Sequence, residues 1–205
     1  KNNKISIWYS VPTVFMQLAL CGSFEKINLD SLRLLIYAGE VFHYTYLNIL
    51  RKKLKTAEIV NLYGPTETNV ITAYNLNNSF YDLTENVPIG FPCPYAQIYI
   101  VDENNCPVEK GVEGELIVRG DSVMIGYFNN QEETSRFIKN ITIEGVEQKF
   151  YFTGDIVVQD KDGRIFFRNR RDNIIKIRGF RVDLGEIEST LYKNENIKEA
   201  VALAV

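Results

Sequence analysis

The sequence has very little of the residue types that build many nucleophilic and metal-dependent active sites. It contains one histidine, His43, and three cysteines among 205 residues. Catalysis by a serine–histidine or cysteine–histidine pair is excluded unless His43 supplies it. Because His43 follows Phe42 at the expected start of a helix, we expect a surface or capping role. The cysteines Cys21, Cys93 and Cys106 are odd in number and lack metal-ligand spacing, which predicts reduced side chains in a cytoplasmic protein.

The sequence also lacks a long apolar run and an excess of charge of either sign. Its formal net charge is −3 and 45% of its residues are hydrophobic, a composition that is ordinary for a packed globular protein. We therefore expect neither nucleic-acid binding nor a membrane span. The chain begins with Lys1 and ends in the apolar run Ala200–Val205, so we expect a piece of a longer protein.

The periodicity of apolar residues in the first third of the chain alternates between strand and helix. The expected elements are a strand over 5–9, a helix over 14–20, a strand over 32–37, a helix over 44–54 and a strand over 59–62. This alternation predicts an α/β fold that begins with a parallel α/β layer.

The pattern changes after about Ile71. Short apolar runs such as Gln97–Val101, separated by polar and Gly-rich turns, predict a β-rich subdomain that we expect to be a distorted antiparallel barrel. One short helix over 131–137 interrupts it, capped by Asn129 or Asn130.

The polar stretch Asn169–Asn173 is a candidate linker. The hairpin pattern over 174–182 and the amphipathic helix pattern over 184–192 that follow it predict the start of a small α+β C-terminal subdomain. We place the boundary between 1–171 and 172–205.

The stretch Asn61–Glu67, with the sequence Asn-Leu-Tyr-Gly-Pro-Thr-Glu, is the most informative in the chain. Its Gly-Pro pair forces a turn directly after an expected buried strand, where open α/β sheets place their ligands. Thr66 can donate to a phosphate oxygen, Glu67 can hold Mg²⁺, and Tyr63 offers a flat face for a base. Taken alone, the same residues also fit an ordinary Gly-Pro turn with a Thr-Glu helix start behind it.

Further segments occur in a fixed order around this loop. They are Trp8–Thr13, Ala38–Val41, Gly114–Gly120 with Gly126–Tyr127, Tyr151–Asp155, Arg170–Gly179 and Arg181–Glu188. With Asn61–Glu67, they resemble the adenylate-forming enzymes: acyl-CoA synthetases, luciferases and the adenylation domains of nonribosomal peptide synthetases. The resemblance is closest to the amino-acid-activating branch, including D-alanine–carrier protein ligases. It implies that 1–171 is the C-terminal part of a large adenylation subdomain and that 172–205 begins a small mobile one.

The resemblance implies ATP and Mg²⁺ as cofactors and assigns residues to the nucleoside. Tyr63 would stack on adenine, with Asn61 and the backbone of Gly39 and Glu40 along its edge. Asp155 would accept hydrogen bonds from the ribose hydroxyls, which suits a carboxylate because it can take two donors at once. Taken alone, Asp155 also fits the cap of an ordinary Thr-Gly-Asp turn.

The same resemblance assigns the catalytic roles and a hinge. Thr66 would contact the α-phosphate, Glu67 would bind the metal, and Arg170 would lie near the ribose and phosphate. Asp172 would be the hinge about which the small subdomain rotates, and Lys176–Gly179 the loop that enters the site for thiol transfer. A surface arginine, a loop carboxylate and a plain hairpin glycine are the competing interpretations.

The resemblance also outlines a pocket for the carboxylic acid. Its positions are Thr13, Ile36, Ala38, Leu62, Val70 and Ile71. They are mostly aliphatic and contain no charged partner, which favours a small or medium apolar side chain. Core packing explains the same residues equally well.

The implied function is that of an ATP-dependent ligase. It would activate a carboxylic acid, expected to be an amino acid, as an acyl-adenylate with release of pyrophosphate, and transfer it to the phosphopantetheine thiol of a carrier protein. The alternatives are an acyl-CoA synthetase, with CoA as acceptor, and a non-catalytic nucleotide-binding module derived from such an enzyme. The family's phosphate loop would lie before Lys1 and its catalytic lysine after Val205, so we do not expect the segment alone to complete the reaction. Asn169 stands where the family usually has glycine.

Overall fold

The first sheet carries the parallel strands that the sequence predicts. The computed structural model describes residues 4–22, 28–54, 56–76, 87–171, 174–191, 193–194, 197 and 199–203. Strands β1 (Ile7–Ser10), β2 (Leu34–Ala38) and β3 (Glu58–Tyr63) are parallel, and β4 (Thr72–Asn75) and β5 (Phe91–Pro92) extend the sheet with antiparallel pairing. The expected parallel α/β layer is confirmed.

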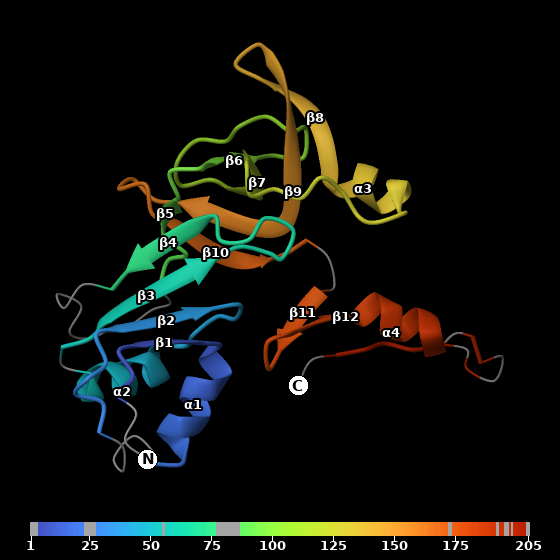
Figure 1. Ribbon diagram of the computed structural model, residues 1–205. Coiled ribbons are helices and arrows are strands. Elements are labelled where there is room, and N and C mark those ends of the chain that lie inside the picture. Colours follow the sequence, from blue (N-terminus) through green and yellow to red (C-terminus); the bar gives the residue numbers. More distant parts are fainter. Residues whose placement is uncertain are drawn as a thin grey trace.

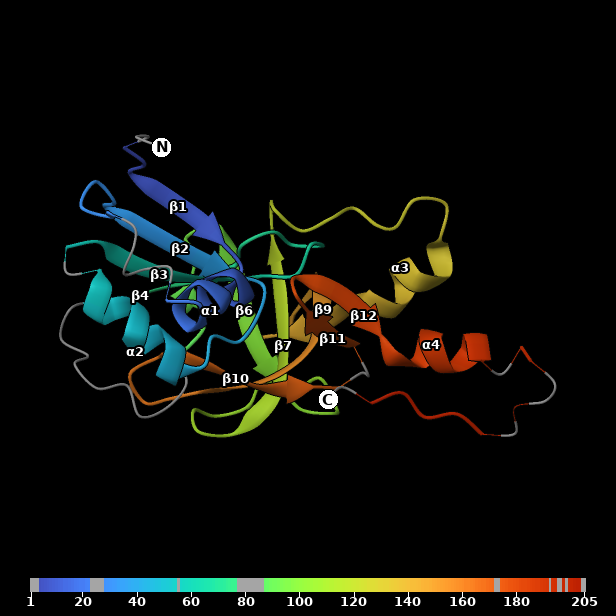
Figure 2. The same cartoon turned by 90° about the horizontal axis from the view of Figure 1, so that it is seen from below.

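Two helices cover one face of this sheet, as both views show (Figures 1 and 2). They are α1 (Pro12–Leu20) and α2 (Tyr44–Lys53). Phe15 of α1, Leu47 of α2 and Leu35 of β2 are fully buried in the core cluster between the helices and the sheet. This packing fixes the helices against the strands whose ends form the site described below.

The β-rich part is a separate antiparallel sheet with its own core. Its order is β10-β9-β7-β6, with β8 paired to β9. The strands are β6 (Ala96–Val101), β7 (Glu113–Gly120), β8 (Ile138–Ile143), β9 (Val146–Gln159) and β10 (Ile165–Arg170). The long strand β9 pairs with β7, β8 and β10, so it organises the whole subdomain.

Short capped elements match the polar side chains that the sequence places at their starts. The helix α3 (Gln131–Phe137) has Asn130 as its N-cap, whose side chain accepts from the Glu133 N–H at 3.1 Å. His43 caps α2 in the same way, since its Nδ1 accepts from the Thr45 N–H at 3.4 Å. The capping roles expected of Asn130 and His43 are therefore confirmed.

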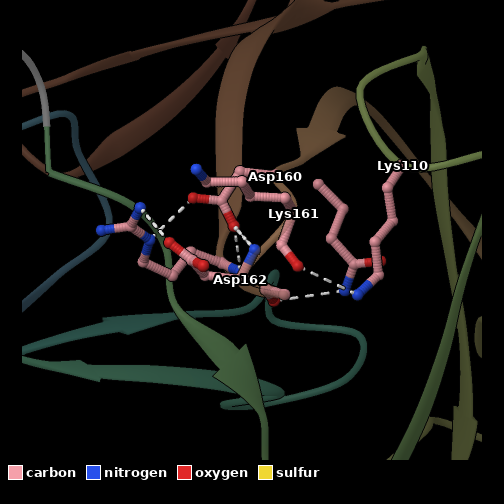
Figure 3. Close-up of polar contacts among 7 residues, drawn as sticks. Lys110, Asp160, Lys161 and Asp162 are labelled. Atoms are coloured by element: carbon pink, nitrogen blue, oxygen red, sulfur yellow. Dashed lines mark hydrogen bonds and ion pairs between the residues drawn. The ribbon is translucent and has the colours of Figure 1, made fainter.

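The turn between β9 and β10 is held by side chains (Figure 3). Asp160 Oδ1 accepts from the N–H groups of Asp162 and Arg164 at 3.0 and 2.8 Å, and Asp160 Oδ2 pairs with Arg164 Nε at 2.7 Å. Lys110 Nζ donates to the Lys161 carbonyl at 3.3 Å and ties the turn to a neighbouring loop. This turn sets the register in which β9 and β10 meet.

The C-terminal piece starts as a hairpin and a helix. Strands β11 (Ile174–Ile177) and β12 (Phe180–Asp183) pair with each other, and α4 (Leu184–Leu191) follows directly. The expected α+β elements are present. The hinge residue Asp172 lies outside the described residues, so the boundary between 171 and 172 stays a prediction. In the described part of the chain, no helix has the length and apolar character needed to cross a membrane.

The core between α2 and the first sheet gives a stability prediction with a control on the same helix. Leu47 is 0% exposed and Ile49 is 45% exposed. Leu47→Ala should lower the free energy of unfolding by about 2–5 kcal/mol because it leaves a cavity. Ile49→Ala should change it by less than about 1 kcal/mol. Chemical denaturation of the full-length variants measures both values, and equal effects would contradict the assignment of Leu47 to the core.

Candidate functional site

A cleft opens where the three parallel strands end. Its volume is about 430 Å³, and its lining includes Val11, Gly39 and Gly64, the residues that directly follow β1, β2 and β3. The carboxyl ends of parallel strands are the usual place for ligands in open α/β sheets. The helices and the strand order therefore position this cleft.

The loop after β3 closes on itself beside the cleft. A Cβ on Gly64 would lie 1.7 Å from the Asn69 carbonyl oxygen, so only glycine fits at this close approach. The Ile71 N–H donates to the Tyr63 carbonyl at 2.8 Å and closes the base of the loop. The expected Gly-Pro turn is thus a compact structure over residues 64–70, which we call the β3 loop.

Four of the predicted site residues line the cleft. They are Ala38, Gly39, Thr66 and Val70. Thr66 is exposed on the β3 loop, where its hydroxyl can reach a ligand. One hydroxyl, two apolar side chains and the backbone of a glycine meet here, an arrangement that suits a mixed polar and apolar ligand.

The other predicted pocket residues occupy different places. Ile36 and Ala38 are two residues apart on β2, so their side chains point to the same face of the sheet, the one opposite the helices. Leu62 is the partner of Ala38 on β3. Thr13 lies at the start of α1 and binds Glu40 through both its N–H and its hydroxyl. Ile71 is fully buried in the core of the β-rich part. Ile36, Leu62, Thr13 and Ile71 are not among the residues that line the cleft.

A buried polar cluster joins the β3 loop to the β-rich sheet. The Tyr63 hydroxyl donates to Asp155 Oδ2, and Arg170 Nη1 pairs with Asp155 Oδ1 at 2.7 Å. Arg170 Nη2 also donates to the Thr153 carbonyl at 3.3 Å. Side-chain exposure is 11% for Arg170 and 5% for Asp155, which makes this arginine a buried partner of the carboxylate and not a surface charge.

The environment keeps the Tyr63 hydroxyl protonated. Burial raises the pKa of Tyr63 well above its usual value, and the charge of Asp155 and the hydrogen bond to it raise it further. Tyr63 is therefore a hydrogen-bond donor to Asp155 at any physiological pH. Tyr63 and Arg170 thus contact different oxygens of Asp155 and hold the carboxylate in one orientation.

Glu67 is held from a second direction. It is 8% exposed, and its Oε1 accepts from the Tyr127 hydroxyl at 2.7 Å. The Met124 N–H donates to the Glu67 carbonyl at 2.7 Å. Both contacts come from the connection between β7 and α3, so this connection fixes the backbone and the carboxylate of Glu67 together.

Glu40 joins the start of α1 to the tip of the C-terminal hairpin. Its Oε2 accepts from the Thr13 N–H at 3.0 Å and from the Thr13 hydroxyl at 2.5 Å. Its Oε1 accepts from the Gly179 N–H at 2.5 Å. Gly179 has a φ of +83° and packs against Val11, whose Cγ1 would lie 3.2 Å from an added Cβ. The hairpin tip therefore rests on the edge of the cleft, next to β1 and β2 (Figure 1).

Asn61 makes a contact within the protein that the sequence does not predict, and its expected place at the edge of adenine stays a prediction. It is 8% exposed, and its Nδ2 donates to the Pro88 carbonyl at 2.9 Å. This bond holds the segment around Pro88 against β3. The side-chain amide thus supports the wall of the site from within the protein.

The partners that orient the predicted residues are not evident from the sequence. Glu115 is buried, accepts from the Gly154 N–H at 3.0 Å and pairs with Arg171 Nη1 at 2.8 Å. Together with Tyr127 and Thr153, these residues stand inside or beside the quoted motifs. Their motif membership was the available signal, but it does not say which side chain each one touches.

Fold and cleft define an α/β protein with a ligand site beyond the ends of its parallel strands. A family model described as "AMP-binding enzyme" matches residues 1–128. The chain belongs to this family of AMP-binding enzymes, and the resemblance stated from its motifs is confirmed.

Curated relatives extend over the whole chain. L-proline--[L-prolyl-carrier protein] ligase of Pseudomonas fluorescens is 37% identical over 205 residues, which are 100% of this chain and 38% of the relative. D-alanine--D-alanyl carrier protein ligase of Lactiplantibacillus plantarum is 37% identical over 201 residues, covering 97% of this chain and 39% of the relative. The chain thus spans about two-fifths of the length of these relatives.

Solved structures share the fold. IdnL1 matches with a TM-score of 0.88 at 27% identity, over 98% of this chain and 42% of that structure's chain. NpsA-ThdA, an artificially fused adenylation–PCP di-domain NRPS from Klebsiella oxytoca, matches with a TM-score of 0.78 at 24% identity, over 98% and 37% of the two chains. The order of the α/β layer, the β-rich part and the C-terminal hairpin is therefore the family's fold.

The buried pair predicts a large stability effect with a matched surface control. Asp155→Ala leaves the Arg170 guanidinium buried without its carboxylate, which should destabilise the protein by about 3–5 kcal/mol. Asp162→Ala removes a carboxylate that pairs with Arg164 at 2.9 Å but is 57% exposed, and its effect should stay below about 1 kcal/mol. Denaturant titration of both variants checks this difference. Similar values would mean that Arg170 readily finds water or another partner.

Proposed function

We propose that the full-length protein activates a carboxylic acid, with an amino acid as the favoured substrate, by forming an acyl-adenylate from ATP. The β3 loop carries this proposal. It presents Thr66 to the cleft and holds Glu67 against Tyr127, and Tyr63 directly before it donates to Asp155. One short segment thereby connects a ligand cleft with two ordered carboxylates, and the family membership supplies the reaction class.

In this proposal the nucleoside lies between the cleft and the Asp155 cluster. Tyr63 stacks on adenine, Asn61 and the Gly39–Glu40 backbone lie at its edge, and Asp155 binds the ribose hydroxyls. The proposed role of Arg170 is to orient Asp155. Its ion pair with Asp155 Oδ1 would hold the carboxylate in position to bind the ribose diol.

The residues present fit a magnesium ion that is shared with phosphates. Among the described residues there is no group of three or more His, Cys, Asp or Glu side chains that could form an all-protein metal site. Mg²⁺ in phosphate-binding sites needs only one or two carboxylates from the protein. Glu67 is the carboxylate that would hold it, and Thr66 would donate to the α-phosphate. When bound, the ion would neutralise charge on the phosphate oxygens.

The acyl group is proposed to have a small or medium apolar side chain. Ala38 and Val70 line the cleft, and Ile36 and Leu62 lie on the same face of the sheet as Ala38. The acceptor is proposed to be the phosphopantetheine thiol of a carrier protein, because two relatives are named as carrier-protein ligases. CoA is the alternative acceptor. A cytoplasmic location follows from the reduced state expected of the cysteines.

Pyrophosphate exchange on the full-length protein tests this function. A screen of amino, aryl and fatty acids should give exchange with an amino acid of small apolar side chain. Thioester formation on carrier protein or on CoA then identifies the acceptor. Binding of ATP without exchange for any acid would favour the non-catalytic nucleotide-binding module.

The metal assignment gives a sharper prediction. Glu67→Gln keeps the shape of the side chain and removes its charge, so exchange should fall at least roughly tenfold while the fold survives. The control is Glu58→Gln, because Glu58 is exposed, its carboxylate accepts from Asn75 Nδ2 at 3.0 Å, and it is not among the residues that line the cleft. Pyrophosphate exchange rates of both variants measure the effect on adenylation, and their thermal midpoints show whether the fold survives. Near-normal exchange in Glu67→Gln would make this residue purely structural.

The hairpin tip gives a prediction for the second half-reaction. We propose that Asp172 is the hinge and that Lys176–Gly179 docks at the cleft for thiol transfer, with Glu40 as the docking group. Glu40 Oε1 accepts from the Gly179 N–H and Oε2 accepts from Thr13. Glu40→Gln replaces one of these oxygens by an NH2 group, which cannot accept, so one of the two contacts must break. The hairpin contact is the exposed one and should be lost.

Glu40→Gln should therefore reduce thioester formation by about fivefold or more relative to pyrophosphate exchange. Glu186→Gln, on an exposed position of α4, serves as the control. Both half-reactions are measured on the same preparation of full-length protein. A parallel decrease of both rates would show that Glu40 acts on the cleft and not on docking.

A further inference from the structure

Tyr127, in the connection between β7 and α3, contacts Glu67. Neither the motif that contains Tyr127 nor the proposed function gives its side chain a role. Tyr127 donates its hydroxyl to Glu67 Oε1 at 2.7 Å. The two residues are 60 positions apart, and they lie in segments that follow strands of different sheets, β3 for Glu67 and β7 for Tyr127. A buried carboxylate that must present a ligand atom in one direction needs its other oxygen fixed, since the side chain otherwise turns about its last torsion.

The position of Tyr127 is itself fixed by α3. Its N–H donates to Thr134 Oγ1 at 2.9 Å, and Thr134 Oγ1 in turn donates to the Asn130 carbonyl at 2.8 Å. The preceding residue, Gly126, lies so close to Thr134 that an added Cβ would be 2.9 Å from Thr134 Cγ2. The Tyr127 ring packs edge-on against Phe137, with 6.2 Å between the ring centres. Helix α3 therefore holds the phenol rigidly.

We propose that Tyr127 is a positioning residue for the metal-binding carboxylate of Glu67. It orients the Glu67 side chain so that a magnesium–nucleotide complex meets a preformed anionic ligand. The inference rests on the proposed function, because it takes Glu67 as the group that holds the metal. It goes further in assigning the rigidity of that ligand to a hydroxyl from α3 and its connection, and not to the β3 loop alone.

The test compares ATP binding with and without magnesium, so it does not depend on turnover. Tyr127→Phe in the full-length protein removes the hydroxyl and keeps the ring against Phe137. Calorimetry with saturating Mg²⁺ should show ATP binding weakened by about 5- to 30-fold, while binding in the presence of EDTA should remain as in the unmodified protein. The Mg²⁺ concentration for half-maximal pyrophosphate exchange should rise in parallel.

The matched control is another tyrosine whose hydroxyl lies outside the site. Tyr99 accepts from Gln97 Nε2 at 2.9 Å, and its ring packs against Phe150 with 5.7 Å between the ring centres. Tyr99→Phe should leave ATP affinity unchanged in both conditions. An equal loss of affinity with and without Mg²⁺ in Tyr127→Phe, or behaviour identical to Tyr99→Phe, overturns the inference.

Two further variants separate this inference from the proposed function. Glu67→Gln should abolish the magnesium-dependent part of ATP binding, and adding Tyr127→Phe to it should have no additional effect. If Glu67→Gln keeps that part, the metal assignment and the inference both fall. If only Tyr127→Phe keeps it, the inference alone falls. Should Tyr127→Phe fold poorly, Thr134→Val removes the acceptor that holds the Tyr127 backbone and should produce a smaller loss of the same kind.

Discussion

The close approach between Gly64 and the carbonyl of Asn69 is the constraint on which the site depends. A side chain at position 64 would collide with that carbonyl, so the β3 loop can close only with glycine there. Closure brings the Ile71 N–H to the Tyr63 carbonyl, and within the loop the Thr68 N–H donates to the Pro65 carbonyl. The cleft, the Asp155 cluster and the Glu67 contact all start from residues in this loop or at its base.

The loop and Tyr63 at its base also connect two parts of the fold that have separate cores. Tyr63 reaches the long strand β9 through Asp155, and Glu67 reaches the β7–α3 connection through Tyr127. The first sheet supplies the cleft, and the β-rich part supplies the groups that hold the loop's polar side chains. A rearrangement of either sheet would therefore change the site, although each sheet is stabilised by its own apolar cluster.

The sequence predicts local structure better than it predicts the site's contacts. The sequence predicts helix α3 with its observed bounds, and Asn130, one of the two caps that it allows, accepts from the Glu133 N–H. The partners of the predicted residues are not encoded locally. Tyr63 and Asp155 are 92 positions apart, and Glu40 and Gly179 are 139 apart. Motifs identified which positions matter, but only the folded chain reveals that Arg170 is a buried partner of Asp155 and that Asn61 supports the segment at Pro88.

The double use of Glu40 has an energetic consequence for the hairpin. If the tip moved away as proposed, the carboxylate would keep both hydrogen bonds from Thr13, so α1 would keep its N-terminal support. The exposed bond to Gly179 is then exchanged for a bond to water, a difference of about 1 kcal/mol. This hydrogen bond therefore adds little to the free energy that holds the tip at the cleft, and a bound molecule with a small preference for one position would outweigh it.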